Sequence, residues 1–272
     1  MVRIAVVTPL FPIPEEPFRG QPIYFTVKEL QRHAEVAVFC PVAAYPGWAR
    51  PSSFTYYESV DEGYSPPGVH ASYLKYPAFP LLSRPLNAVL STRALLAPAR
   101  EFQPDLILAY WIHPGGSAAV SIGARLGVPV VVGARGSDLR RPPDWMTRRT
   151  VQRTLRSADF VVTVSNELRE CAIALGVAAD RVRAIPNGCD TTVFYPGERR
   201  EACAEIGADP DGQLILFVGH LIASKGVLDL VEAFTRLAPS RPKLRLSFVG
   251  DGGLRAELEA RLRRAGLSER AL

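Results

Sequence analysis

Short runs of valine, isoleucine and leucine alternate with helix-length segments along most of the chain, and this alternation restricts the fold more than any other feature. The run RIAVVT at 3–8 is a first expected strand, and VPVVVG at 128–133 is another. Strands that are apolar at nearly every position are typical of a parallel sheet with both faces covered. The segments between them have the length and spacing of covering helices. The first part of the chain is therefore predicted to be a doubly wound, Rossmann-like α/β domain.

The other elements of this domain follow from the same patterns. Further strands are expected at 35–40, 69–76, 105–109, 159–164 and 182–185, and helices at 22–33, 84–102, 116–126, 144–156 and 166–175. Residues 41–68 are rich in proline, glycine and tyrosine. A connection of this length without its own regular structure is uncommon in a compact domain. We predict that it is an irregular loop that is either functional or mobile.

The pattern is interrupted once and then resumes. Prolines and glycines are frequent from 186 to 212, as in an interdomain connection. Beyond it, strands are expected at 213–218 and 244–249 and helices at 225–237 and 254–265. A domain this small would bury only about 60% of its unfolded surface. We therefore predict an N-terminal domain at 1–190, a linker at 191–211, and at 212–272 the beginning of a second Rossmann-like domain.

Composition excludes several classes of protein. The chain of 272 residues is 47% hydrophobic and 22% charged, which are globular rather than disordered values. None of its four cysteines forms a Cys-x-x-Cys pair, so neither a zinc site nor a redox motif is expected. No apolar run approaches the roughly 18 residues of a membrane span, and no P-loop or dinucleotide-binding glycine motif is present. We expect a cytoplasmic protein that needs no metal or other cofactor and does not bind nucleic acid.

Positive charge is concentrated in one segment. The chain has a net charge of +5, and Arg140–Arg156 contains six arginines but a single acid, Asp144. One interpretation is a solvated helix face. The other is a basic surface for anionic lipid at the inner face of the membrane, or for a phosphorylated acceptor.

In open α/β sheets ligands bind beyond the carboxyl ends of the strands, and the candidate residues of the first domain lie there. Gly20 ends the loop after the first strand, where a helix begins, and is either an anion-binding glycine or a simple turn. His113 leaves the strand at 105–109 and is either functional or structural. Asp138 would cap a helix or contact a hydroxyl-rich ligand. Asn187 precedes a glycine, which by itself indicates only a turn.

The second domain repeats this arrangement. His220 follows the strand at 213–218, and Lys225 is expected to open the next helix, where it could face a diphosphate. Gly250 and Gly252 follow the strand at 244–249. Glycines at such a position would allow a nucleotide to approach the backbone.

Five segments in this order resemble the retaining glycosyltransferases of the GT-B fold, family 4. They are the proline- and glycine-rich loop reaching Gly20, the segment ADFVVTVS at 158–165, IPNGCD at 185–190 with FYP at 194–196, FVGHL at 217–221 with KGV at 225–227, and FVGDG at 248–252. Each segment alone is a weak indication of the family, but their order and spacing across nearly the whole chain make the set specific. The resemblance implies two Rossmann-like domains, the first binding an acceptor and the second a nucleotide-sugar donor.

The resemblance also implies roles for the candidate residues. Gly20 would approach the donor phosphates, and His113 would hydrogen-bond the transferred sugar. Lys225 would neutralise the leaving diphosphate, so that His113 and Lys225 are the predicted catalytic residues. The remaining predicted donor-binding residues are His220, Gly250 and Gly252, and the predicted acceptor- or sugar-binding residues are Asp138 and Asn187.

The chain departs from the family pattern at two points. His220 stands where members usually have arginine, and the downstream Glu-x7-Glu motif that grips the donor is absent. The chain is therefore expected to lack the C-terminal part of a longer enzyme. The expected function is transfer of a sugar from a UDP- or GDP-sugar to a glycan or lipid-linked acceptor in cell-surface polysaccharide or glycolipid synthesis. The alternatives are an incomplete acceptor- or membrane-binding fragment, and a GT-B nucleotide-sugar epimerase.

Overall fold

The computed structural model describes residues 1–49, 63–79, 83, 86–140 and 144–271. The chain forms two compact units, Met1–Gly188 and Cys189–Leu272 (unit 1 and unit 2), and each is described by itself. Part of the predicted loop at 41–68 and the first residues of the predicted helix at 84–102 lie outside the described residues.

Unit 1 is built on a parallel sheet of seven strands in the order β3-β2-β1-β4-β5-β6-β7. The strands are β1 (Arg3–Val7), β2 (Glu35–Ala44), β3 (Ala71–Pro77), β4 (Leu106–Tyr110), β5 (Val130–Ala134), β6 (Phe160–Thr163) and β7 (Val182–Ala184). The order reverses between β1 and β4, as in a doubly wound sheet. The predicted α/β fold class is thus confirmed.

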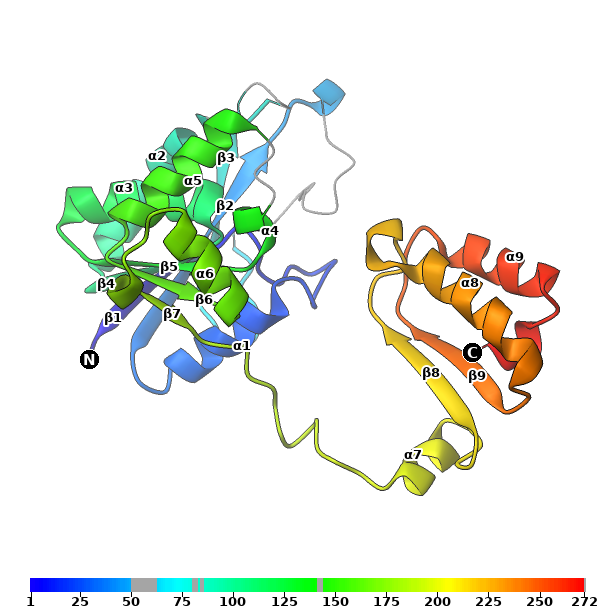
Figure 1. Ribbon diagram of the computed structural model, residues 1–272. Coiled ribbons are helices and arrows are strands. Elements are labelled where there is room, and N and C mark those ends of the chain that lie inside the picture. The colour runs from blue at the N-terminus through cyan, green and yellow to red at the C-terminus, as the bar shows by residue number, and fades with distance from the viewer. Residues whose placement is uncertain (50–62, 80–82, 84–85, 141–143, 272) are drawn as a thin grey trace. The chain divides into compact units, whose positions relative to one another are not determined.

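Helices cover both faces of this sheet. They are α1 (Gln21–Leu30), α2 (Asn87–Phe102), α3 (Ser117–Leu126), α4 (Ser137–Arg140), α5 (Trp145–Ser157) and α6 (Asn166–Ala174). Figure 1 shows α2, α3 and α5 on one face and α1 on the other. Alternate residues of β1 enter two separate cores: Ala5 and Val7 join the core under α2 and α3, and Ile4 and Val6 join the core under α1. The apolar run in β1 therefore has both faces buried.

Polar side chains fix where the later helices begin. Asp144 precedes α5 and its carboxylate accepts from the backbone N–H of Thr147 at 2.7 Å. Ser165 precedes α6 and accepts from Leu168 N–H at 3.3 Å. Each cap satisfies one of the free N–H groups of the first helical turn.

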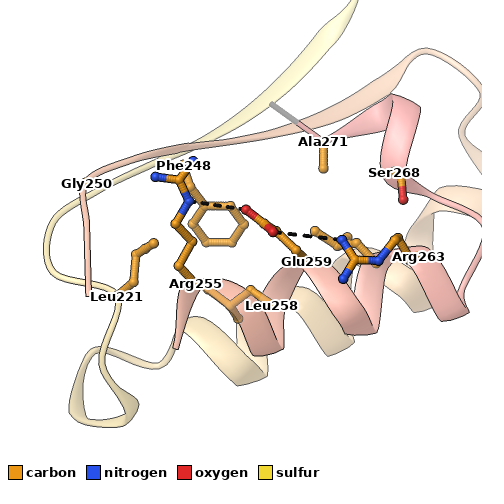
Figure 2. A pocket seen from close by; sticks show the side chains of 10 residues that line it. Leu221, Phe248, Gly250, Arg255, Leu258, Glu259, Arg263, Ser268 and Ala271 are labelled. Carbon is orange, nitrogen blue, oxygen red and sulfur yellow. Dashed lines mark hydrogen bonds and ion pairs between the residues drawn. The ribbon is translucent and has the colours of Figure 1, made fainter. Parts of the chain in front are cut away.

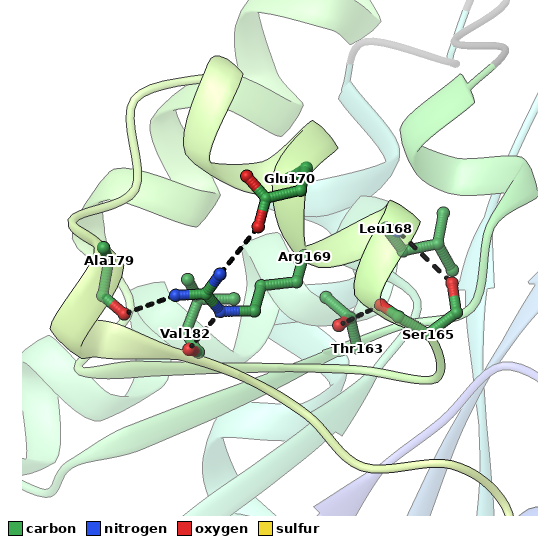
Figure 3. Close-up of polar contacts among 7 residues, drawn as sticks. All are labelled: Thr163, Ser165, Leu168, Arg169, Glu170, Ala179 and Val182. Carbon is green, nitrogen blue, oxygen red and sulfur yellow. Dashed lines mark hydrogen bonds and ion pairs between the residues drawn. The ribbon is translucent and has the colours of Figure 1, made fainter.

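Helix α6 is tied to the edge of the sheet by one arginine. Arg169 donates to the carbonyls of Val182 in β7, at 3.3 Å, and of Ala179, at 3.4 Å, and it pairs with Glu170 (Figure 3). These contacts hold β7 in place, and the chain leaves unit 1 after this strand.

Strand β2 is longer than predicted. The strand was expected to end at Cys40, but β2 runs through Pro41 to Ala44. The backbone N–H of Val38 donates toward β3, whereas the carbonyl of Phe39 accepts from Thr8 on the β1 side. The nitrogen of Pro41, two residues after Phe39, therefore faces the β1 side, beyond the end of β1. No ladder bond is lost there, so proline is tolerated.

Unit 2 consists of α7 (Arg199–Glu205), β8 (Gln213–Val218), α8 (Val227–Leu237), β9 (Leu244–Val249) and α9 (Arg255–Arg264). The two strands are parallel, and Figure 1 shows α8 and α9 side by side on one face of them. Val227, Phe234 and Leu246 are fully buried in the core between these layers. The predicted linker at 191–211 contains α7.

Candidate functional site

The loop after β4 places His113 at the carboxyl edge of the unit 1 sheet. Trp111 has φ 62° and ψ 121°, a conformation that bulky residues rarely adopt. The turn Ile112–Gly116 follows, with a cis peptide bond between His113 and Pro114, and α3 then begins at Ser117. A positive φ at a residue as bulky as Trp111 is concentrated at functional sites in proteins. The predicted role of His113 itself stays a prediction.

Gly20 is required by close packing. It directly precedes α1 with φ 61°, and a Cβ atom at this position would lie 2.3 Å from the carbonyl oxygen of Leu10. The loop after β1 can thus fold back on itself only with glycine here. Its predicted contact with donor phosphates stays a prediction.

Asp138 joins two neighbouring loops. Its Oδ1 accepts from the backbone N–H groups of Gly136, at 2.9 Å, and Arg135, at 3.1 Å, and its Oδ2 accepts from Ile112 N–H at 3.3 Å. The loop that follows β5 is thereby tied to the loop that carries His113. Burial raises the pKa of the Asp138 carboxyl, and these backbone donors partly oppose that rise. The carboxylate positions the two loops, and contact with a hydroxyl-rich ligand remains an expectation.

Arg135, which sequence reasoning did not select, connects Asn187 to the same edge. Its Nη1 donates to Asn187 Oδ1 at 2.6 Å, and its guanidinium carbon lies 4.8 Å from the centre of the Tyr110 ring. Burial lowers the pKa of Arg135, whereas Tyr110 and Asp138 act to raise it. The available signal was an arginine that directly follows a strand beside the predicted Asp138.

In unit 2 two glycine-containing loops pack directly against each other. A Cβ at Gly250, which has φ 151°, would lie 2.0 Å from the carbonyl oxygen of Gly219, and one at Gly252 would lie 2.6 Å from that of Leu221. Close approach of the loops that follow β8 and β9 therefore accounts for these glycines. Proximity of Gly250 and Gly252 to a nucleoside stays a prediction.

His220 and Lys225, the two predicted residues of unit 2 that are not glycines, have exposed side chains. His220 follows β8, and Lys225 lies in the turn Ala223–Lys225. The sequence predicted that Lys225 opens the next helix, but α8 begins at Val227, because Gly226 takes a left-handed conformation and precedes it. Lys225 thus stands just before the helix N-terminus, where the helix dipole favours negative charge.

Unit 2 also holds a pocket of about 280 Å³ between β9 and α9 (Figure 2). Its walls include Phe248 and Leu258, and Arg255 and Arg263 both pair with Glu259 along α9, at 3.2 and 3.8 Å. Its lining residues include Gly250 but none of the other predicted donor-binding residues. We therefore do not assign the donor to this pocket. The full lining is Leu221, Phe248, Gly250, Arg255, Leu258, Glu259, Leu262, Arg263, Ser268 and Ala271.

The predicted residues thus fall into two groups, one in each unit. In unit 1, Asp138 is bonded to the loop of His113, and Asn187 joins them through Arg135. The loop of Gly20 adjoins them too, because a Cβ at Gly115 would lie 3.5 Å from Pro9. In unit 2, the predicted residues are His220, Lys225, Gly250 and Gly252.

The basic segment 140–156 lies mostly on α5. Arg148, Arg149 and Arg153 are exposed, as is Trp145, over whose ring the Arg149 guanidinium lies at 5.4 Å. Arg156 instead donates to the carbonyl of Leu175 at 3.3 Å. Residue 141 and the side chain of residue 140 lie outside the described part of the chain.

Neither a membrane-spanning helix nor a metal-binding cluster occurs among the described residues. No helix among them is long and apolar enough to cross a membrane. No group of three or more histidine, cysteine, aspartate or glutamate residues in the same ranges could hold a metal ion.

Comparison with known proteins agrees with this architecture. TuaC of Bacillus subtilis, named a teichuronic acid biosynthesis glycosyltransferase, is 28% identical over 270 residues, which cover 94% of this chain and 67% of TuaC. Sucrose-phosphate synthase of Thermosynechococcus elongatus has a TM-score of 0.69 at 18% identity, over all of this chain and 70% of that one. Anabaena HepE, solved in complex with UDP, has a TM-score of 0.67 at 16% identity, over all of this chain and 68% of its own. These structures confirm the GT-B-like fold class.

Family models cover both units. The model for the glycosyl transferase 4-like domain matches residues 24–188, and that for glycosyl transferases group 1 matches residues 198–271. The first match alone covers more than half of the chain. The protein therefore belongs to the glycosyl transferase 4-like family of glycosyltransferases.

Proposed function

We propose that this protein transfers a sugar, with retention of configuration, from a UDP- or GDP-sugar to a glycan or lipid-linked acceptor in cell-surface polysaccharide or glycolipid synthesis. The observation that carries the proposal is the group 1 glycosyl transferase match over unit 2, where His220 and Lys225 stand at the carboxyl edge of β8 and β9. The chain spans about two thirds of TuaC, so activity and substrates are proposed for the whole protein.

The proposed donor site is in unit 2. The known complex of HepE with UDP supports a nucleoside diphosphate as the ligand. Departure of a diphosphate develops negative charge on its terminal phosphate, and fixed cations and N–H groups directed at that charge lower the barrier. Lys225, with the N-terminus of α8 behind it, supplies both kinds of group. His220 is the second proposed donor-binding residue.

The proposed acceptor site is in unit 1. His113 would hydrogen-bond the transferred sugar, and Asp138 would hold the loop of His113 in place through Ile112. A general base is not assigned, since attack from the face that the diphosphate leaves needs none from the protein.

An acceptor-dependent assay tests this proposal. Release of UDP or GDP from its sugar conjugate is measured with and without a polyprenyl-linked acceptor, in the whole protein. Transfer requires acceptor for fast release, whereas an epimerase forms the nucleotide without one. Lys225→Ala should lower kcat/KM by about 30- to 1000-fold, the effect of losing about 2–4 kcal/mol of preorganised charge.

Lys243→Ala is the matched control, because Lys243 is exposed and lies before β9, at the opposite edge of the two strands. Equal kinetics for the Lys225 and Lys243 variants would contradict the donor site. Absence of both turnover and nucleotide binding would favour the alternative of an acceptor- or membrane-binding fragment.

We further propose that the exposed face of α5 binds anionic lipid at the cytoplasmic face of the membrane. Three arginines and an exposed tryptophan on one helix combine electrostatic attraction with an aromatic anchor, as interfacial helices do. Replacing Arg148 and Arg149 by glutamine should weaken sedimentation with phosphatidylglycerol vesicles, whereas the same change at Arg263 and Arg264 of α9 should not. Equal binding to phosphatidylcholine vesicles would contradict this proposal.

A further inference from the structure

The guanidinium of Arg135 is held at the carboxyl edge of the unit 1 sheet, beside the loop of His113. The guanidinium carbon lies over the ring of Tyr110, at the end of β4, and Asn187, beyond the end of β7, accepts from Nη1. Three strand ends therefore contribute to its surroundings: β4, β5 and β7. This edge is where open α/β sheets bind their ligands.

The charge of Arg135 is not balanced by a carboxylate. No ion pair joins it to an acidic side chain within the described residues. Asp138 is near enough to act on its pKa, but the carboxylate of Asp138 is occupied by the backbone N–H groups of Ile112, Arg135 and Gly136. The Nε atom of Arg135 is buried and has no hydrogen-bond partner there.

The partly buried charge of Arg135 would lower the stability of unit 1 without any benefit if the residue bound no ligand. Partial burial of a charge without a counter-ion lowers stability, and here burial lowers the pKa of Arg135. A role limited to holding Asn187 would not require a charge, since one neutral donor would satisfy that single acceptor. An anion would supply the missing partner, and the fork of guanidinium N–H groups matches a phosphate or a carboxylate.

We propose that Arg135 binds an acidic group, phosphate or carboxylate, carried by the acceptor. The inference rests on the proposed function, because it places the acceptor in unit 1. It makes Arg135 a specificity-determining residue: acceptors with an acidic group close to the reacting hydroxyl are selected over neutral ones of the same shape. The contact with the Tyr110 ring and the hydrogen bond to Asn187 hold the guanidinium in place.

The test follows the Nε–H resonance of Arg135 in the full chain by ¹H–¹⁵N NMR, assigned through its bonded correlations to the Arg135 backbone and checked by its absence in Arg135→Gln. The probes are inorganic phosphate, glucuronate and neutral glucose. We expect a saturable shift with phosphate or with glucuronate, and none with glucose. A response to phosphate alone assigns a phosphorylated acceptor, and a response to glucuronate alone assigns a uronic acid. An unmoved Arg135 resonance with both anions would overturn the proposal.

Two variants test whether anion binding needs the charge of Arg135. Arg135→Gln should weaken binding of the active anion by at least about tenfold, the effect of losing a charged hydrogen bond. Arg125→Gln removes the same charge from an exposed position in the last turn of α3 and should bind as the wild type does. Equal affinity of Arg135→Gln and wild type would refute the assignment. The resonance of the wild-type chain decides the matter even if that variant does not fold.

Binding of UDP to unit 2 is measured in the same samples. For Arg135→Gln we expect binding of the anion to be lost and binding of UDP to be retained. If the Arg135 resonance fails to respond while UDP still binds, the acidic acceptor is wrong and the proposed donor site stands. If the anion binds and UDP does not, the donor site is wrong.

Discussion

Replacing Asp138 by asparagine tests whether this carboxylate holds the site of unit 1 together. The change keeps the shape of the side chain and one acceptor oxygen, which can still serve Gly136 and Arg135. The new NH₂ group then faces the N–H of Ile112, which the carboxylate accepts at 3.3 Å. One partly buried N–H is left without a partner, at a cost of about 1–3 kcal/mol.

The assay uses the tryptophans, because Trp48, Trp111 and Trp145 are the three of this chain and all lie in unit 1. Tryptophan fluorescence therefore follows the thermal unfolding of unit 1. A loss near 2 kcal/mol should lower its midpoint by about 4–8 °C in a unit of this size. The Ile112 amide should also exchange its hydrogen faster.

Asp159→Asn is the control. The carboxylate of Asp159 accepts from the backbone N–H of Val130 at 2.8 Å, at the opposite edge of the same sheet. Asparagine keeps one acceptor oxygen for this single N–H group, so Asp159→Asn should leave both the stability of unit 1 and binding at the carboxyl edge nearly unchanged. A variant at Asp138 that is as stable as wild type, with unchanged exchange at Ile112, would refute the bridging role.

The remaining predictions concern pH, packing and reactivity. Because burial raises the pKa of Asp138, its protonated form stabilises the fold fully below the unfolded pKa of about 3.9, and this contribution is lost as pH rises through the folded pKa. Wild type should thus lose stability relative to Asp138→Asn above about pH 4, and a pH-independent difference would contradict the shift. Gly250→Ala should cost unit 2 about 1–3 kcal/mol by overpacking against Gly219, measured by hydrogen exchange in β8 and β9. Gly253→Ala, with open space around it, should be nearly neutral, and equal effects would exclude the clash. Burial raises the pKa of the Cys40 thiol, so iodoacetamide should label exposed Cys189 well before Cys40, and the reverse order would contradict the burial.

Most strands and helices were predictable because periodicity alone specifies them. The apolar runs at β1 and β5 are buried or half-buried as expected, whereas Leu216 and Val218 of β8 are exposed. The helices begin and end within a few residues of prediction. The extension of β2 through Pro41 was not predictable. It depends on β1 ending first, which is a property of the neighbouring strand.

The candidate site was only partly predictable. Strand ends identify which residues reach the carboxyl edge, and this located His113 and Asp138. The sequence does not tell which carboxylate is occupied by backbone N–H groups and which cation lacks a partner. The structure shows that Asp138 bridges two loops through backbone N–H groups and that Nε of Arg135 has no hydrogen-bond partner among the described residues. At Gly20 and Gly250 the sequence predicted close approach of a ligand to the backbone, which stays a prediction. The structure shows that the backbone of Leu10 and Gly219 already requires glycine at these positions.

The central claim is that unit 2 binds a nucleotide-sugar donor through its diphosphate. The most direct measurement is a calorimetric titration of the chain with UDP, GDP and their common sugar conjugates, repeated for Lys225→Ala and Lys243→Ala. Saturable binding that prefers one base, weakened at Lys225 and unchanged at Lys243, is the predicted result. Absence of binding to every nucleotide by a folded chain, or equal binding by all three proteins, would contradict it.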